Sequence, residues 1–529
     1  MFVPAIVLGL FFRLEKRTGA GNVTLTVDLG YSKYQGAYAA NGVSQWFGIR
    51  YAAPPVGDLR FRAAADPLVN DTVQIADTHG PSCHFSPSAS SNPNHSEDCL
   101  FLDVYAPTQN MTAILHPVFV YFQGGGFNSL SNQNLDGNSL ISAGDHDIVI
   151  VTFNYRVGVQ GFLTSQEVKA NGDLNVGLLD QRKVLEWIQQ YIHLFGGNPK
   201  HVTIGGDSAG GASVDLHLSA YGGRDDGLFH AAAAESQSFG ALLTVNEAQY
   251  QYDGLVQRVG CSNDTDTLQC LRNTDIAVIS KNNINIPTPG GAGGNPIFMW
   301  SPVIDETFIV DYTYNLYSQG KFVKVPSIFG DDTNEGTIWT PSSLNSSTAM
   351  DNFLKNQFVN LTQTDLEQIN SYYPAVQQFP GKGAFWRAAA NAYGEMRYTC
   401  PGIYISTTIS THGQPASYNY RWDVLSTRNA QNGLGVPHVS ELSSIWGSSD
   451  PPGDALIPTI QAYWTSFIRT KNPNTYKLKS APEWAKFDAT GMERIHIPND
   501  PTNVTIETVP GDQRARCAFL NSIGASINQ

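Results

Sequence analysis

The feature that most constrains this chain is the pentapeptide Gly206-x-Ser208-x-Gly210. It directly follows the apolar residues 202–205 and directly precedes a segment with helical periodicity. A serine between two glycines at such a junction is typical of a sharp strand-to-helix turn, where small residues let strand and helix approach closely. The alternative is a glycine-rich turn with an incidental serine. Its place after a strand favours the first interpretation and predicts a nucleophilic hydroxyl at Ser208.

Apolar runs bounded by turn residues recur along the chain and predict buried strands. They cover residues 99–105, 117–122, 148–153, 202–205, 325–329 and 417–422. Helical segments lie between them, most clearly residues 178–192, whose leucines and isoleucines share one face. This alternation predicts an α/β fold with a large, mostly parallel central sheet, helices on both faces and the ligand site in the loops after the strands.

The N-terminus predicts a segment that is removed from the mature protein. Residues 2–12 form an apolar run, and the dibasic pair Lys16-Arg17 follows. The run has the length of a signal-peptide core and is too short to span a membrane. A buried first strand is the alternative, and the dibasic pair resembles a processing site or an artificial junction. We expect residues 1–17 to be a signal or processing segment and residues 18–529 to form one domain with long insertions.

Two further patterns indicate secretion into the extracellular space. The chain has eight Asn-x-Ser/Thr sequons, which are candidate glycosylation sites: Asn22, Asn70, Asn94, Asn110, Asn263, Asn345, Asn360 and Asn503. The six cysteines are even in number, and short loop closure favours sequential disulfides: Cys83 with Cys99, Cys261 with Cys270, and Cys400 with Cys517. Reduced thiols in a cytosolic protein are the alternative.

Charge restricts the partners of the chain. The formal net charge is −14, and no cluster of Lys and Arg is present. Nucleic acid and anionic membrane surfaces both require such clusters, so neither is an expected partner. No membrane anchor or lipidation motif follows Pro510. The expected partner is therefore a small molecule, and the sequence does not indicate an oligomeric state.

A serine nucleophile that forms a tetrahedral intermediate needs backbone donors for the oxyanion. The predicted strand 117–122 leads into a triple glycine. The amides of Gly125 and Gly126 can face the substrate oxygen because no side chain blocks them, and the N–H of Ala209 follows the nucleophile. A phosphate cradle is excluded because the Lys-Ser/Thr pair that would follow it is missing.

The serine also requires a histidine base and an acid, which follow it in the chain order serine, acid, histidine. The histidines downstream of the candidate acids are His412, His438 and His496. His438 lies in a turn-rich loop after a predicted strand, whereas His412 precedes a strand and His496 lies within one. The acid candidates follow the predicted strand 325–329, and spacing alone does not choose among them: Asp331, Asp332 and Glu335.

The sequence resembles the type-B carboxylesterase/lipase family, which includes cholinesterases and fungal lipases, and is most similar to its secreted fungal esterases. Seven segments match the family in its order: residues 47–57, 97–104, 154–158, 177–181, 195–199, 206–211 and 334–336. The resemblance implies the α/β-hydrolase fold, Glu335 as the acid and His438 as the base. It also implies supporting roles for Ser236 and Glu441, and the sequential disulfides. Two structural ion pairs are implied as well, Arg60 with Glu97 and Arg156 with Asp180.

Three departures from the family pattern bear on specificity. Gln123 replaces the usual His or Tyr before the triple glycine, and Gln237 replaces the glycine that usually follows Ser236. The loop between Cys83 and Cys99 is short, rich in Ser and Pro, and has no Trp to stack on a choline cation. It also lacks the amphipathic stripe of an interfacial lid.

We therefore expect a secreted serine carboxylesterase that hydrolyses short- to medium-chain carboxylic esters through an acyl-enzyme, with Ser208, His438 and Glu335 as its triad. The chemistry requires neither a metal nor an organic cofactor. A lipase of the same family is the alternative within this class. A non-catalytic adhesion or binding protein is the alternative from another class, although its known forms usually lose the nucleophile.

Overall fold

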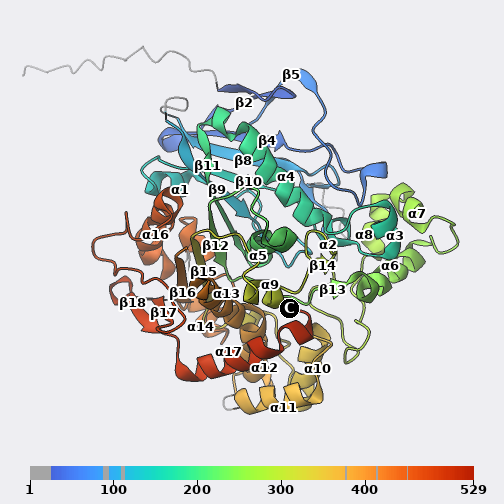
Figure 1. Ribbon diagram of the computed structural model, residues 1–529, viewed down its shortest axis with the longest axis vertical. Helices are drawn as coiled ribbons and strands as arrows, with labels where there is room; N and C mark the ends of the chain where they lie inside the picture. The colour runs from blue at the N-terminus through green and yellow to red at the C-terminus, as the bar shows by residue number, and fades with distance from the viewer. Residues whose placement is uncertain (1–24, 87–93, 109–113, 376–377, 413–414, 449–450) are drawn as a thin grey trace, which may run out of the picture.

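The computed structural model describes residues 25–86, 94–108, 114–375, 378–412, 415–448 and 451–529. Within these residues an eleven-stranded sheet runs through the molecule (Figure 1). In spatial order its strands are β18 (Thr505–Thr508), β17 (Glu493–Pro498), β16 (Ser417–Asp423), β15 (Ser327–Asp332), β12 (Ala231–Glu235), β11 (Gly197–Asp207), β9 (His116–Phe122), β10 (Val149–Phe153), β8 (Phe101–Pro107), β4 (Val43–Arg50) and β3 (Ala37–Tyr38).

The strands from β17 to β10 are parallel, whereas β18 at one edge and β8, β4 and β3 at the other are antiparallel. All six predicted strands are present, with ends shifted by a few residues. Three small sheets flank the main one. They comprise β1 (Thr26–Asp28), β2 (Ser32–Gln35) and β5 (Asn70–Ile75); β6 (Ser82–Cys83) and β7 (His95–Ser96); and β13 (Leu243–Thr244) and β14 (Val303–Ile304).

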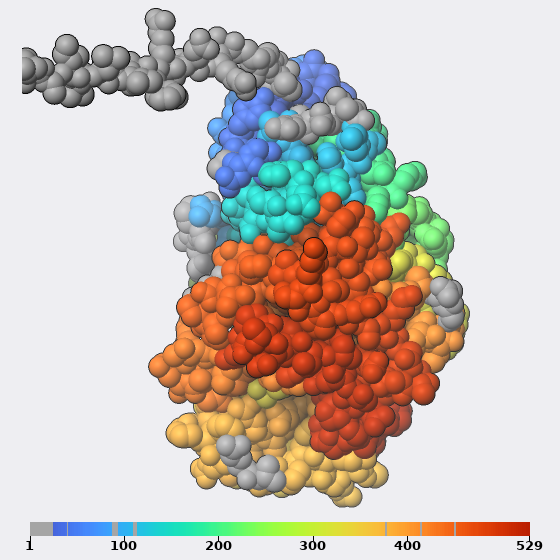
Figure 2. Space-filling model, turned by 90° about the vertical axis from the view of Figure 1, so that its left-hand side faces the viewer, coloured from blue at the N-terminus to red at the C-terminus, as the bar shows by residue number. Residues whose placement is uncertain are grey.

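Helices surround the sheet, and the C-terminal part of the chain (orange to red) covers the face seen in Figure 2. The longest are α4 (Val176–Tyr191), α5 (Ala209–Gly223), α6 (Val245–Val259), α13 (Cys400–Thr411), α16 (Ile457–Thr470) and α17 (Gly511–Ile523). The others are α1 (Asn138–Ala143), α2 (Gly158–Phe162), α3 (Gln166–Asn171), α7 (Thr267–Asn273), α8 (Ile276–Asn282), α9 (Thr313–Ser318), α10 (Ser347–Gln357), α11 (Gln363–Tyr372), α12 (Trp386–Gly394), α14 (Thr427–Gln431) and α15 (Leu442–Ile445).

The sheet is buried on both faces, as its central strand β9 shows. Val118, Val120 and Phe122 belong to the hydrophobic core on one face. Phe119 and Tyr121 belong to the core on the other. Because successive side chains of a strand point to opposite faces, a strand between two helical layers must be apolar at every position. This is the physical reason for the continuous apolar runs in the sequence.

Two long insertions follow strands of the parallel part of the sheet. The first, residues 236–326, follows β12 and includes α6 to α9. The second, residues 333–416, follows β15 and includes α10 to α13. The second insertion has its own hydrophobic core, built around residues such as Met350, Phe353 and Tyr393. Both insertions begin at the carboxyl ends of parallel strands, where the candidate catalytic residues also lie.

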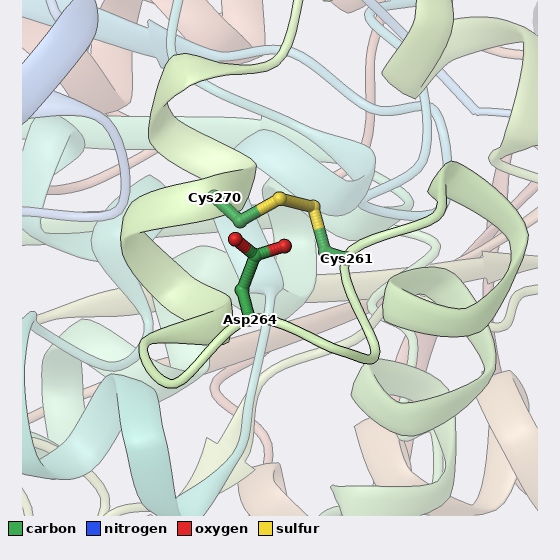
Figure 3. A group of neighbouring side chains, drawn as sticks. All are labelled: Cys261, Asp264 and Cys270. Atoms are coloured by element: carbon green, nitrogen blue, oxygen red, sulfur yellow. A yellow bond between two sulfur atoms is a disulfide. The ribbon is translucent and has the colours of Figure 1, made fainter.

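Three disulfides are present, with the predicted pairing: Cys83–Cys99, Cys261–Cys270 and Cys400–Cys517. The last one joins α13 to α17 across 117 positions of sequence. Figure 3 shows Asp264 directed toward the Cys261–Cys270 bond. Because both sulfurs are consumed in the disulfide, this group offers no thiolate to a metal ion.

Both ion pairs implied by the resemblance are formed. Arg60 and Glu97 are joined by two hydrogen bonds of 2.6 and 2.7 Å. Arg156 and Asp180 are fully buried and joined by bonds of 2.7 and 2.6 Å. Such two-point contacts fix the planes of both side chains, so the pairs hold the segments that carry them together.

Candidate active site

Ser208 lies between β11 and α5 in a backbone conformation that few residues adopt. Its φ is 56° and its ψ is −118°. A non-glycine residue held there costs of the order of 1–3 kcal/mol, which the surrounding structure must offset. The turn is held because the N–H of Ser208 donates to the carbonyl of Glu235 at 2.9 Å. A Cβ on Gly210 would lie 1.9 Å from the carbonyl oxygen of Phe122, so only glycine permits this close approach.

Three side chains from three loops form one hydrogen-bonded chain. The hydroxyl of Ser208 lies 2.8 Å from Nε2 of His438. Nδ1 of His438 lies 2.5 Å from Oε2 of Glu335. Ser208 follows β11, Glu335 follows β15, and His438 lies in the loop after β16. The parallel direction of these strands brings their carboxyl ends to one edge of the sheet, where side chains 230 positions apart meet.

Glu335 is held by contacts on its second oxygen. Oε1 accepts a hydrogen bond of 2.8 Å from the hydroxyl of Ser236 and one of 2.7 Å from the N–H of Asp332. Burial raises the pKa of Glu335, and these two donors oppose the rise because they stabilise the carboxylate. Ser236 therefore contacts Glu335 directly even though Gln237 follows it.

Glu441 is not part of the hydrogen-bonded chain of Ser208, His438 and Glu335. Its carboxylate accepts a hydrogen bond of 2.6 Å from the hydroxyl of Tyr420, and burial raises its pKa. Among the described residues no hydrogen bond connects Glu441 to His438 or Ser208. Its influence on His438 is therefore electrostatic, through a carboxylate that favours the charged imidazole.

His438 is buried among aromatic rings. Its ring centre lies 4.3 Å from that of Tyr398 and 5.6 Å from that of Trp339. Burial lowers the pKa of His438 because an imidazolium is poorly solvated there. The imidazole is therefore neutral at neutral pH, as a group that accepts the proton of a serine hydroxyl must be.

The triple glycine lies against the turn at Ser208. Gly125 and Gly126 have φ values of 116° and 61°. The N–H of Gly124 donates to the Asp207 carboxylate at 2.9 Å, which ties the loop to the residue before Ser208. Among the described residues, no group accepts a hydrogen bond from the amides of Gly125, Gly126 or Ala209. These three donors remain available for a ligand.

Gln123, which stands where the family usually has His or Tyr, supports the glycine loop through its side chain and its carbonyl. Its amide nitrogen donates to the carbonyl of Phe153 at 2.6 Å and to the side chain of Asn154 at 3.2 Å. The hydroxyl of Tyr155 donates to the carbonyl of Gln123 at 2.7 Å. The departure from the family pattern therefore leaves the strand end anchored to the neighbouring strand β10 and the loop after it.

The other sequence candidates for base and acid have different partners. The ring of His412 lies 2.9 Å from the carbonyl of Thr408, and His496 lies 3.0 Å from Asp423. Asp331 accepts a hydrogen bond from Gln237 at 2.8 Å. Asp332 accepts one of 2.9 Å from the N–H of Ser440, so it positions the loop of His438 without contacting its ring.

The sequence analysis did not identify the aromatic walls of the site. Phe298 approaches the glycine loop so closely that a Cβ on Gly126 would lie 2.2 Å from its ring. Trp339 stacks edge-to-face on Phe298 and also contacts His438. These residues belong to no short motif, and only the fold brings them to Ser208 from the two insertions.

The sequons are all on the surface where the structure describes them. The asparagines at positions 70, 94, 263, 345, 360 and 503 are exposed. Asn22 and Asn110 lie outside the described residues, as do residues 1–17 and residues 87–93 of the loop between Cys83 and Cys99. None of the described helices is long and apolar enough to cross a membrane.

The sheet order, the strand-to-helix turn and the flanking helical layers define an α/β-hydrolase enzyme. A model of the family described as "Carboxylesterase family" matches residues 24–519. The chain belongs to this family and is a carboxylic ester hydrolase. This confirms the family, fold class and enzyme class predicted from the sequence.

Individual relatives agree with this assignment. The chain is 31% identical to Secreted lipase 4 of Gibberella zeae, over 94% of this chain and 91% of the relative. It is 29% identical to Lipase 1 of Geotrichum candidum, over 86% and 88% of the two chains. The crystal structure of Aspergillus niger EstA superposes with a TM-score of 0.93 at 41% identity, covering 96% of this chain and 100% of EstA.

Proposed function

We propose that this enzyme is a secreted serine carboxylesterase that hydrolyses short- to medium-chain esters with Ser208, His438 and Glu335 as its catalytic triad. The observation that carries the proposal is the hydrogen-bonded chain from Ser208 through His438 to Glu335. Secretion is supported by the exposed sequons, the three disulfides and the names of the secreted fungal relatives.

In the first half of the reaction, Oγ of Ser208 attacks the ester carbonyl while Nε2 of His438 takes its proton. Glu335 orients the imidazole and stabilises its charged form. The oxyanion rests on the amides of Gly125, Gly126 and Ala209. His438 then protonates the leaving oxygen, and the alcohol departs from an acyl-enzyme on Ser208.

In the second half, His438 removes a proton from water, which attacks the acyl carbonyl. The tetrahedral intermediate collapses, the acid is released, and Ser208 regains its proton from His438. Side chains and backbone amides supply every step, so the proposed reaction needs no metal or organic cofactor.

The test is hydrolysis of ethyl butyrate by the wild type and by Ser208→Ala. We expect turnover to fall by about 10⁴-fold or more, because the nucleophile is lost. Ser219→Ala on the same helix is the matched control, since its hydroxyl only donates to the carbonyl of Asp215. Wild-type turnover by Ser208→Ala would refute the proposal.

A further inference from the structure

Two buried carboxyl groups meet beside the proposed triad. The side chains of Asp332 and Glu441 lie within hydrogen-bond distance of each other, and each residue is only 1% exposed. Asp332 is the last residue of β15, and Glu441 directly precedes α15 in the loop that carries His438. Two carboxylates repel each other at such a distance, whereas a carboxylic acid and a carboxylate attract each other because they share a proton.

The hydrogen bonds of the pair leave one oxygen of each group without a donor. Oδ2 of Asp332 accepts the N–H of Ser440 at 2.9 Å, and Oε1 of Glu441 accepts the hydroxyl of Tyr420 at 2.6 Å. Among the described residues, Oδ1 of Asp332 and Oε2 of Glu441 are buried and have no partner. Such atoms are rare in folded proteins because they are costly. A proton held between the two side chains explains why neither oxygen needs another donor.

No cation offsets a negative charge on Asp332. Asp332 lines a polar cavity of about 290 Å³ whose wall includes three arginines: Arg421, Arg494 and Arg516. Each of these arginines forms an ion pair with another carboxylate, and within the described part of the chain none pairs with Asp332. A buried carboxylate without a counter-ion is strongly disfavoured relative to the neutral acid. The lack of a counter-ion therefore favours the protonated form of Asp332.

The surroundings of the pair place the shared proton on Asp332. Burial and the carboxylates of Glu441 and Glu335 raise the pKa of Asp332 well above its usual range. Burial also raises the pKa of Glu441, but the hydrogen bonds from Tyr420 and Asp332 oppose that rise. The other titratable groups close to the pair are Glu235 of β12, Asp331 of β15 and His438 of the loop. The acid form of Asp332 therefore donates to the carboxylate of Glu441.

Asp332 is bonded both to the acid of the proposed triad and to the loop of its base. The N–H of Asp332 donates to Oε1 of Glu335 at 2.7 Å. Its carboxyl group accepts a hydrogen bond from Ser440, two positions after His438. The loop is thus tied to the end of β15 where His438 must face Glu335. A negative charge on Asp332 would repel Glu441 and open this contact.

From these contacts we propose that Asp332 positions His438 as a neutral carboxylic acid, which accepts a hydrogen bond from Ser440 and donates one to Glu441. Asp332 acts through the loop and not on the reacting atoms, and its proton is not transferred in the reaction. The inference rests on the proposed function, because it takes His438 as the base. Asparagine has the same shape and also offers one acceptor and a donor, so it should replace Asp332.

The first test compares hydrolysis of ethyl butyrate at pH 7 by the wild type, Asp332→Asn and Asp332→Leu. Asp332→Asn keeps an acceptor for Ser440 and a donor for Glu441, so kcat/KM should stay within about threefold of the wild type. Leucine has a similar volume but offers neither group, so kcat/KM should fall by at least about tenfold, as the loss of one or two hydrogen bonds allows. Circular dichroism shows which variants are folded.

The second test is the acid limb of kcat/KM, which reports the protonation of His438. Asp332→Asn removes no charge from a neutral acid, so the apparent pKa of the limb should stay within about 0.3 of the wild-type value. Glu441→Gln is the matched control, because it amidates the other half of the pair, whose carboxylate raises the pKa of His438. Its limb should move to lower pH. A merely structural role of Asp332 predicts no such difference between the two variants.

Four outcomes overturn this inference and leave the proposed function in place. The limb of Asp332→Asn moves to lower pH as that of Glu441→Gln does, because Asp332 then carries a charge. The limb is the same in all three proteins, because Glu441 is then not the charged partner. Folded Asp332→Asn loses more than about threefold in kcat/KM, or Asp332→Leu keeps full activity. A wild type inactive on ethyl butyrate overturns the proposed function itself.

Discussion

At the scale of single residues, the acid of the proposed triad shows what a fold adds to a sequence. Asp331, Asp332 and Glu335 lie within five positions, and spacing alone does not choose among them. The structure separates them because β15 continues to Asp332 and then turns. The turn directs Glu335 to His438, whereas Asp331 faces Gln237. The resemblance to a known family implied Glu335, and it is Glu335 rather than Asp331 that lies within hydrogen-bond distance of His438.

We expect Glu335→Gln to lower kcat by about 10³–10⁴-fold, because a neutral amide neither stabilises the imidazolium nor fixes its tautomer. Asp331→Asn is the matched control, since it removes a neighbouring buried carboxylate, and it should stay within tenfold of the wild type. The measurement is steady-state hydrolysis of ethyl butyrate. A severe loss in Asp331→Asn or Asp332→Asn together with an active Glu335→Gln would reassign the acid.

The buried environment of His438 gives a prediction for pH dependence. Because burial lowers its pKa, protonation of the imidazole begins only below the usual histidine value of about 6.5. Protonation removes the base, so kcat/KM should be constant near neutral pH and fall in acid with an apparent pKa below about 6.5. The profile is measured with ethyl butyrate, and circular dichroism checks that the fold persists. If kcat/KM instead falls in acid with an apparent pKa above 6.5, the carboxylates around His438 raise its pKa more than burial lowers it.

At the scale of secondary-structure elements, the strands that carry large apolar side chains were predictable from the sequence, whereas β12 was not. β12 consists of four alanines and a glutamate. Alanine disfavours strands, so its sequence gives no strand signal. The structure shows why it is a strand: it fits between β11 and β15, and helix α5, which follows Ser208, packs against it and leaves little room for side chains. The π-helical turn Glu395–Thr399, which carries Arg397 and Tyr398, also has no sequence signature.

The disulfides differ in the length of chain that they close, and this predicts unequal effects on stability. Cys400–Cys517 closes a separation of 117 positions and Cys261–Cys270 one of 9. Loop-closure entropy then predicts that the first disulfide stabilises the folded protein by about 2 kcal/mol more than the second. The double variant Cys400→Ala/Cys517→Ala should therefore unfold at a lower urea concentration than Cys261→Ala/Cys270→Ala. Equal midpoints for the two variants would show that the long disulfide does not constrain the unfolded chain as this argument requires.

At the scale of the whole molecule, the chain shares its fold with EstA of Aspergillus niger and is similar in sequence to fungal proteins named lipases. The family, the sheet and the positions of the motifs at its carboxyl edge were predictable, because they rest on local patterns repeated along the chain. The aromatic walls were not, because they depend on how the two insertions fold over that edge.

Substrate range is a property of the molecule as a whole, and the short Ser- and Pro-rich loop between Cys83 and Cys99 predicts it. Such a loop cannot form the amphipathic flap that an interfacial lipase requires. We expect hydrolysis of acyl chains of roughly two to eight carbons, a range guided by the gain of about 0.8 kcal/mol per buried CH₂. Rates on butyrate esters should rise smoothly through the solubility limit. A sharp rise at that limit, with faster hydrolysis of long-chain triglyceride emulsion, would identify a lipase instead.

The most direct test of the account is covalent titration of the wild-type enzyme with an organophosphonate ester, followed by peptide mass spectrometry. The account predicts one label per chain, located on Ser208, with loss of activity in proportion to labelling. Ser208→Ala should take up no label at this peptide. Failure of the wild type to react, or stoichiometric labelling at any other residue, would contradict the assignment of Ser208 as the nucleophile.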